Sequence, residues 1–254
     1  MCGRFVLTTP PDRLAEYFAA RPAGDVVFSA SWNVAPSRDV LGVALNREGR
    51  RELAAYRWGL VPSYASDPSV GNRLVNARAE SLATRPAFRA AFSRRRLLVC
   101  ADGFYEWRRD DKGRRQPYYF CRRDGTPIAF AGLFELWRPR DGDAGTPWLR
   151  SCTIVTTDAG PDVAAVHDRM PVVLEPPAQE AWLEAAEPEL LSDLLAPSPA
   201  GTLQSWAIGR AVGDVRNDQP ELLAPLRLEG AAEAPRQFPL PLGQAADRSG
   251  RRHG

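Results

Sequence analysis

The chain has 254 residues, of which 44% are hydrophobic and 25% charged, which is typical of a folded globular protein and excludes a wholly disordered one. Its apolar runs, such as residues 97–101, are strand-sized and far shorter than the ~20 residues of a membrane helix. The first residues lack the basic, apolar and small-residue regions of a signal peptide. We therefore expect a cytoplasmic protein with no membrane partner.

Residues 1–150 carry an excess of positive charge. Residues 1–150 hold 25 Lys and Arg against 16 Asp and Glu, whereas residues 151–254 hold 8 against 15. Every cation except Lys112 is an arginine, and guanidinium groups suit phosphate oxygens. A GC-rich coding bias would give the same composition, so composition alone does not establish nucleic-acid binding.

The predicted elements begin with a short helix over residues 9–19. Thr9 is its candidate N-cap, and Leu14, Tyr17 and Phe18 fall on one face. Three more helices are predicted over 84–92, 176–185 and 189–195. Strand-like runs lie at 96–101, 117–121, 127–133, 151–156, 171–174 and 203–208.

Polar, glycine-containing connectors at 108–115 and 140–145 are typical of hairpin loops. The sequence has no βαβ alternation and no glycine-rich phosphate loop, which disfavours nucleotide-binding folds. We predict a single compact α+β domain over residues 1–228, built on a curved, mainly antiparallel, barrel-like sheet with peripheral helices. Residues 229–254 have the composition of a flexible tail.

The four cysteines are far apart, with no pair at metal-ligand spacing, so we predict neither a metal site nor a disulfide framework. Three of them, Cys100, Cys121 and Cys152, lie in strand-like apolar runs and are predicted core residues. Cys2 lacks such a context. If Met1 is removed, Cys2 carries an α-amine beside a thiol, a pair that can condense with an aldehyde and close a thiazolidine ring. The alternative is that a cysteine at this position is incidental.

Two further ionisable residues are candidates for proton transfer. Glu106 stands between aromatic residues after an apolar strand, where desolvation would raise its pKa and make it a general acid. A surface ion pair with Arg108 or Arg109 is the alternative. His167 is the only histidine within the predicted domain and could move protons, although a lone histidine is often structural.

Other segments offer polar and aromatic groups. Asn76 and Arg78 would share one side of an extended segment, presenting an amide and a phosphate-binding guanidinium. Trp58 and Pro36 lie in turn-like segments whose aromatic residues could stack on unpaired bases. Tryptophans in turns also commonly cover a core.

The order of these segments is more specific than any one of them. It closely resembles the SOS response-associated peptidase (SRAP) family of abasic-site processing proteins, over nearly the whole chain except the tail. The segments that carry the resemblance are MCGRF, WNVAPS, WGLVPSY, NARAE, ADGFYEW, AGLFE and HDRMP.

The resemblance implies a protein of the DNA damage response that binds single-stranded DNA and traps the aldehyde of abasic sites as a thiazolidine crosslink. Cys2 would be the nucleophile, and Asn76 would hold the Cys2 amine or the sugar. Glu106 would shuttle protons, and His167 would assist imine chemistry, crosslink reversal or β-elimination. The implied DNA contacts are Arg4, Arg78, Arg169, Trp58 and Pro36.

The resemblance also implies AP lyase activity and a peptidase activity that removes the residue before Cys2. No cofactor and no metal are expected. We expect a monomer, cytoplasmic and nucleoid-associated when bound to DNA. Two alternatives remain: a cysteine peptidase acting on external peptides through Cys2, Glu106 and His167, and a noncatalytic single-strand binding module in which Cys2 has no role.

Overall fold

Five strands close into a barrel in the computed structural model, which describes residues 2–24, 26–140, 142–143, 145–185 and 188–226. Neighbouring strands pair antiparallel except where β11 meets β5 in parallel and completes the ring. The ring order is β5 (Arg51–Trp58), β4 (Asp39–Leu45), β7 (Arg96–Ala101), β10 (Ile128–Trp137) and β11 (Leu149–Asp158). Closure leaves these strands without a free edge and encloses much of the apolar core.

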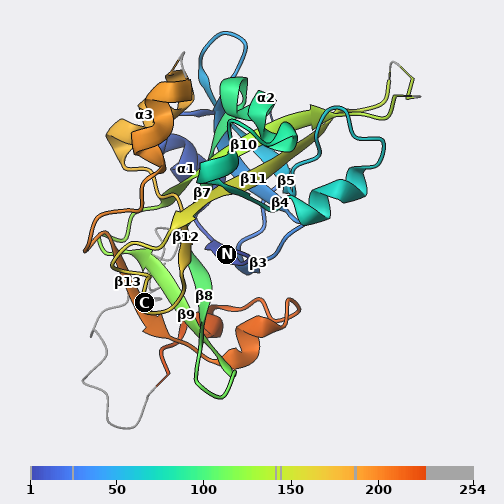
Figure 1. Ribbon diagram of the computed structural model, residues 1–254. Helices are drawn as coiled ribbons and strands as arrows, with labels where there is room; N and C mark the ends of the chain where they lie inside the picture. The colour runs from blue at the N-terminus through green and yellow to red at the C-terminus, as the bar shows by residue number, and fades with distance from the viewer. Residues whose placement is uncertain (1, 25, 141, 144, 186–187, 227–254) are drawn as a thin grey trace, which may run out of the picture.

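A second, wholly antiparallel sheet adjoins the barrel. Its order is β13 (Leu203–Ala207), β9 (Arg115–Arg122), β8 (Gly103–Arg109), β1 (Phe5–Leu7) and β3 (Ser31–Val34). The chain passes from barrel strand β7 into β8 through Asp102 alone, so the two sheets meet there. The β8–β9 hairpin projects away from the barrel (Figure 1). The predicted α+β class with a barrel-like, mainly antiparallel sheet is confirmed.

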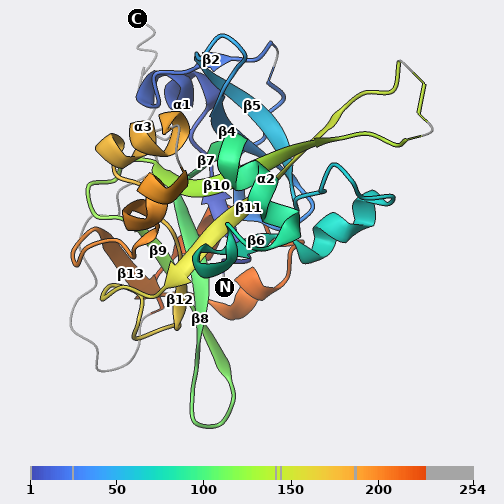
Figure 2. The ribbon, with the colours of Figure 1, turned by 45° about the horizontal axis from the view of Figure 1, so that its top comes forward.

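Three short strands extend the barrel sheet at its margins. β2 (Arg21–Pro22) pairs with β5, β6 (Asn76–Arg78) runs parallel to β11, and β12 (Arg169–Pro171) runs antiparallel to β11. Figure 2 shows β6, β11 and β12 near the N-terminal end of the described chain and near β8. Segments that are distant in sequence therefore converge at one end of the barrel.

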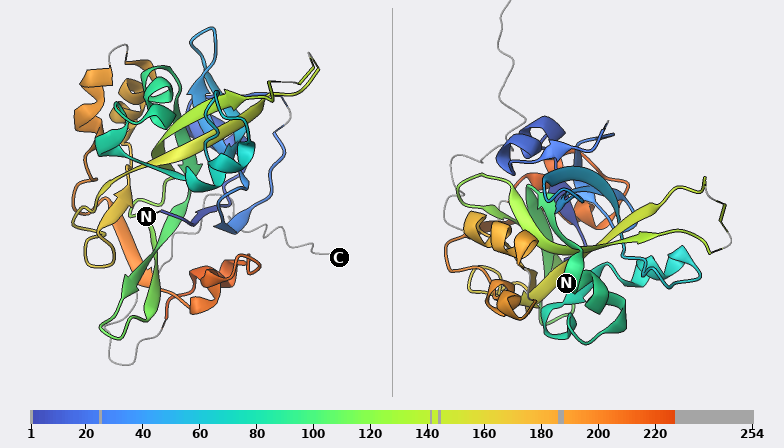
Figure 3. Two further views of the ribbon diagram at one scale, coloured as in Figure 1. Left: turned by 45° about the vertical axis from the view of Figure 1, so that its right-hand side comes forward. Right: turned by 90° about the horizontal axis from the view of Figure 1, so that it is seen from above.

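The helices lie outside the sheets, as Figure 3 shows from two sides. Each α-helix begins with proline in its first turn: α1 (Pro11–Tyr17), α2 (Pro86–Arg94) and α3 (Pro176–Glu184). Short 3₁₀ helices fill the connections: η1 (Pro68–Arg73), η2 (Ala79–Ser81), η3 (Pro188–Leu195), η4 (Arg210–Gly213) and η5 (Pro220–Leu223). In the described part of the chain, no helix is long and apolar enough to span a membrane.

A buried arginine joins α2 and α3 to the barrel. Arg96 donates to the carbonyls of Phe92 at 3.0 Å and Trp182 at 2.5 Å, and also to Ala185. These carbonyls lie at the C-terminal ends of the two helices, where intrahelical donors are missing and a positive charge is favoured. One side chain thus fixes the ends of both helices on β7.

Some sequence predictions differ from the structure. Thr9 is not an N-cap, because its hydroxyl donates to Asp102 at 2.7 Å and the helix begins at Pro11. The segment predicted as a helix over 189–195 forms the 3₁₀ helix η3. The strand predicted at 171–174 lies at 169–171 instead, where it can pair with β11. The predicted tail, 229–254, lies outside the described residues.

Candidate active site

Pairing of β1 with β8 carries the N-terminal segment to Glu106. Phe5 lies opposite Phe104, and the Tyr105 amide donates to the Arg4 carbonyl at 3.0 Å. Because the strands are antiparallel, the residues before Arg4 continue toward Glu106 and Trp107. The Cys2 side chain is fully buried there, and the charge of Glu106 acts on its thiol.

The Cys2 thiol is held in its protonated form. Burial raises its pKa well above the ordinary value, and the negative charge of Glu106 adds to the increase, while the Arg4 backbone amide, hydrogen-bonded to the thiol, opposes it. A thiol in this state needs a nearby proton acceptor before it can act as a nucleophile. Glu106, whose charge acts on this thiol, is the candidate acceptor.

Glu106 has the partly desolvated environment that its sequence context predicts. Its side chain is only 2% exposed, and burial raises its pKa to about 7. At this pKa the carboxyl both donates and accepts protons near neutral pH.

The backbone that positions Glu106 depends on the two residues at the start of β8. A Cβ at Gly103 would come within 2.5 Å of the Phe120 carbonyl oxygen, so glycine is required for β8 and β9 to approach here. The buried Asp102 carboxylate accepts from the backbone amides of Thr8 and Thr9 at 2.6 and 3.0 Å and from both hydroxyls. These contacts tie the end of β1 to the start of β8. The role of Asp102 depends on contacts with a segment distant in sequence, so the sequence alone does not predict it.

Asn76 reaches Cys2 from β6. Its Nδ2 donates to the Cys2 carbonyl at 2.7 Å, so in this structure it holds the carbonyl and neither the amine nor a sugar. Its Oδ1 is buried and has no hydrogen-bond partner among the described residues. Asn76 therefore presents an unused acceptor beside Cys2.

His167 faces Glu106 from the segment before β12. Its Nε2 lies 3.8 Å from Glu106 Oε2, and the Arg169 amide donates to its Nδ1 at 2.9 Å. Burial lowers the pKa of His167, and the charge of Arg109 adds to this, although Asp168 opposes both. The Nδ1 of His167 also lies 2.8 Å from an Asp168 oxygen, so the imidazole stands between two carboxyl groups.

The structure corrects one predicted DNA contact. Trp58 is fully buried, packs against Phe5 with ring centroids 5.1 Å apart, and donates to the Val75 carbonyl at 2.9 Å. It cannot line a DNA path, because no part of its ring reaches solvent. Trp58 is therefore a core residue, as tryptophans in turn-like segments commonly are.

Two predicted phosphate contacts already have partners inside the protein. Arg169 binds Glu80, Asp158 at 2.7 Å and the Thr156 carbonyl at 2.8 Å, and these contacts occupy both terminal nitrogens. They give Arg169 a structural role in this structure, and its phosphate contact remains a prediction.

Arg4 is partly engaged in the same way. Its Nη1 donates to Asn33 at 2.8 Å and to the Val212 carbonyl at 2.9 Å, which joins β1 to β3 and η4. Arg78, by contrast, is exposed at the end of β6, and Pro36 is half-buried. The phosphate contact of Arg78 and the DNA contact of Pro36 remain predictions.

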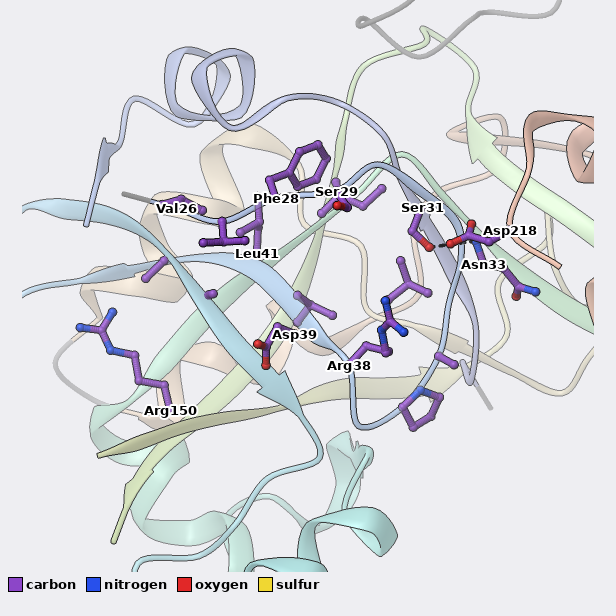
Figure 4. A pocket seen from close by; sticks show the side chains of 18 of the residues that line it. Val26, Phe28, Ser29, Ser31, Asn33, Arg38, Asp39, Leu41, Arg150 and Asp218 are labelled. Atoms are coloured by element: carbon purple, nitrogen blue, oxygen red, sulfur yellow. Dashed lines mark hydrogen bonds between the residues drawn. The ribbon is translucent and has the colours of Figure 1, made fainter. Parts of the chain in front are cut away.

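Two hollows of similar size lie in the described part of the chain. One, of about 760 Å³, belongs to the candidate site and is lined by Glu106 and His167 together with the β8–β9 hairpin. The other, of about 810 Å³, lies between residues 26–31 and strands β4 and β5 (Figure 4). Apolar residues such as Phe28 and Leu41 line this hollow. Charged residues also line it, among them Arg38, Asp39 and Arg150. It contains none of the four candidate catalytic residues.

The candidate site offers acid–base and nucleophilic groups. Among the described residues, no cluster of three or more His, Cys, Asp or Glu side chains could hold a metal ion. The groups that the candidate site brings together are a thiol, an amide, a carboxyl and an imidazole. Cys100, Cys121 and Cys152 are buried away from this set, as predicted for core residues.

Comparison with known proteins identifies the family of this chain. A model of the SOS response associated peptidase (SRAP) family matches residues 1–215. The chain belongs to this family.

Relatives in this family cover nearly all of the described chain. Abasic site processing protein YoqW of Bacillus subtilis is 36% identical over 228 residues, which are 88% of this chain and 99% of YoqW. Abasic site processing protein YedK of Escherichia coli is 30% identical over 233 residues, or 89% and 100% of the two chains. A crystal structure from Bacteroides thetaiotaomicron, 20% identical, covers 89% of this chain and all of its own with a TM-score of 0.77, which shows the shared fold.

Proposed function

We propose that this SRAP family protein traps abasic sites in single-stranded DNA as a thiazolidine crosslink to Cys2. The observation that carries the proposal is the convergence of Cys2, Asn76, Glu106 and His167 from four separate segments. The names of its relatives YoqW and YedK, both abasic site processing proteins, support the same substrate.

The reaction begins with removal of Met1, a peptide-bond hydrolysis that releases the Cys2 α-amine. The Nδ2 of Asn76 holds the Cys2 carbonyl, and the Oδ1 beside it accepts a hydrogen bond from the new amine. This arrangement directs the nitrogen lone pair toward an incoming aldehyde. The role that we propose for Asn76 toward the amine thus works together with its observed contact to the carbonyl.

Two bond-forming steps follow. The amine adds to the aldehyde carbon, and one amine proton passes to the aldehyde oxygen. Protonated Glu106 gives a second proton to the departing hydroxyl, so that an iminium ion and one water form. The Cys2 sulfur then adds to the iminium carbon while its proton passes to the Glu106 carboxylate, which restores protonated Glu106 and closes the ring without a further leaving group. A carboxyl with a pKa of about 7 suits both directions of transfer.

His167 acts on the same carboxyl. Its Nε2 lies 3.8 Å from Glu106 Oε2, and with a proton on Nε2 it stabilises the carboxylate after the Glu106 proton has left. This supports the iminium state that precedes reversal or β-elimination. AP lyase activity and self-removal of Met1 are parts of the proposal.

Intact mass spectrometry tests the proposal, using the protein with and without single-stranded DNA that carries one abasic site. We expect free protein lacking Met1 and an adduct lighter than the two components by one water. Cys2→Ser should retain the imine and lose the heat-stable ring, whereas Cys121→Ser, at a buried cysteine in β9, should crosslink normally.

The alternatives give different results. Heat-stable adducts in Cys2→Ser would contradict ring closure. Retained Met1, salt-sensitive DNA binding and no adduct would favour the noncatalytic binding module. Cleavage of an unrelated peptide, abolished by Cys2→Ala, would favour the external peptidase.

A further inference from the structure

The cleft beside Glu106 extends well beyond the candidate active site. It lies between the β8–β9 hairpin and residues 164–168, with Glu106 and His167 at one end. Three arginines of the hairpin also line it, Arg108, Arg109 and Arg115. A ligand seated at Glu106 can therefore continue along a cationic wall on the projecting hairpin (Figure 1).

Two of these arginines are directly opposite each other. Arg109 pairs with Arg115 in the register of β8 and β9, and both side chains are exposed. Like charges at opposing positions destabilise an antiparallel pair, so a bound anion would relieve the repulsion. Among the described residues neither arginine forms an ion pair with a carboxylate, and the neighbouring Asp110 pairs with Arg114 at 2.7 Å.

Arg108 occupies a different position. Its guanidinium lies over the Tyr118 ring, 5.1 Å from the centroid, on the face of the hairpin that also carries Glu106. The acidic groups of the cleft are Glu106, whose pKa is near neutrality, and the exposed Asp168. The three arginines leave the cleft cationic at neutral pH.

We propose that Arg109 and Arg115 together bind one phosphate of the DNA strand that carries the abasic site. Guanidinium forks match the oxygens of a phosphodiester, and a phosphate between them neutralises the facing charges. This site would hold the strand along the hairpin as it leaves the catalytic residues. The inference rests on the proposed function, since it takes the strand to be the substrate.

Binding is measured without chemistry by using single-stranded DNA with a tetrahydrofuran abasic analogue, which has no aldehyde. We expect Arg109→Gln/Arg115→Gln to lower the affinity about tenfold, as for the loss of one charge-assisted phosphate contact. The slope of log affinity against log salt should fall by about 0.7. The matched control is Arg47→Gln in the exposed β4–β5 turn, which should leave both quantities unchanged.

Neutral methylphosphonate linkages, introduced one at a time around the lesion, locate the contact. One linkage should weaken the wild type as much as the double variant does, with no further loss when the two changes are combined. Equal losses in both proteins at every linkage, or a double variant that binds like Arg47→Gln, would overturn the phosphate site.

Covalent crosslinking is measured in a separate assay, with a strand that carries an abasic site with its aldehyde. A wild type that gives no covalent product while the arginine effect persists would refute the crosslinking and leave the phosphate site supported. A wild type that crosslinks while the arginine pair has no effect on binding would refute only the phosphate site.

Discussion

Glu106 shows how strongly one residue's chemistry depends on its surroundings. An exposed glutamate would be ionised at neutral pH, whereas this side chain is 2% exposed and burial raises its pKa to about 7. The sequence context, a carboxyl between two aromatic residues after an apolar strand, predicted this direction. The partner His167, 3.8 Å away, was named but could not be placed without the structure.

The first prediction concerns the pH dependence of crosslinking. Imine formation needs a neutral amine, whose ordinary pKa is about 8, and a protonated Glu106. The rate constant should therefore rise with pH up to the Glu106 pKa of about 7, change little between about pH 7 and 8, and decline at higher pH. Glu106→Gln should lower the rate about 100-fold and abolish the high-pH decline, as measured by single-turnover gel assays. If Glu106→Gln kept the wild-type pH–rate profile, Glu106 would not be the group that transfers the proton.

The same group gives a prediction for stability. The folded-state pKa of Glu106 is raised to about 7 from 4.5, so the native state binds the extra proton between these values. The stabilisation is complete at low pH and is lost as pH rises through about 7. The free energy of unfolding of Glu106→Gln, relative to wild type, should thus increase from about pH 5 to about pH 8. Urea unfolding of both proteins at several pH values measures this difference in free energy. A difference that does not change with pH would contradict the raised pKa of Glu106.

Asn76 is predicted to be a positioning residue. Asn76→Ala removes the 2.7 Å contact to the Cys2 carbonyl and should slow crosslinking about tenfold, the rate equivalent of one hydrogen bond. Affinity for a tetrahydrofuran-containing strand should stay the same, because the contact orients Cys2 and does not touch DNA. Asn76→Gln is the control for amide chemistry at a shifted position. A loss of affinity equal to the loss of rate would argue for direct DNA contact.

At the scale of elements, a few strand contacts determine where the reactive residues meet. β1 beside β8 brings Cys2 to Glu106, while β6 and β12 flank β11 and deliver Asn76 and His167. The strand-like run at 96–101 was predicted with the observed bounds of β7. Strands β4 and β5 were not predicted, and β4 is buried at five successive positions, so it lacks the alternation that marks a half-exposed strand.

Asp102 offers a test of the junction between the two sheets. Asp102→Ala leaves the buried amides and hydroxyls of Thr8 and Thr9 without their acceptor, and should lower the free energy of unfolding by about 3 kcal/mol. Asp102→Asn should recover most of this, because one oxygen can still accept from both amides. Chemical denaturation compares the two variants. Equal losses in both would show that the charge matters more than the hydrogen bonds.

At the scale of the whole molecule, the arginines separate into structural and exposed cations. Arg96 and Arg169 bind carbonyls and carboxylates, whereas Arg78, Arg109 and Arg115 are exposed. Composition could not make this division, because the same residue type serves both purposes.

Arg78 and Arg169 should therefore respond differently to substitution. Arg78→Gln should reduce the salt slope of single-strand binding by about 0.7 and leave thermal stability unchanged. Arg169→Gln should keep the slope and lower the free energy of unfolding by about 1 kcal/mol, since its carboxylate partners are largely exposed. A reduced slope for Arg169→Gln would support its phosphate contact.

The sequence by itself determined the α+β class, the three α-helices, the buried cysteines and, through the order of its segments, the family. These follow from local periodicity, turn residues and short motifs, which act over a few residues. Only the tertiary structure decided that Trp58 belongs to the core, that Arg169 pairs with Glu80 and Asp158, and that Arg109 faces Arg115. Burial and charge pairing depend on strand register between distant segments, and a side chain's type does not specify its partner.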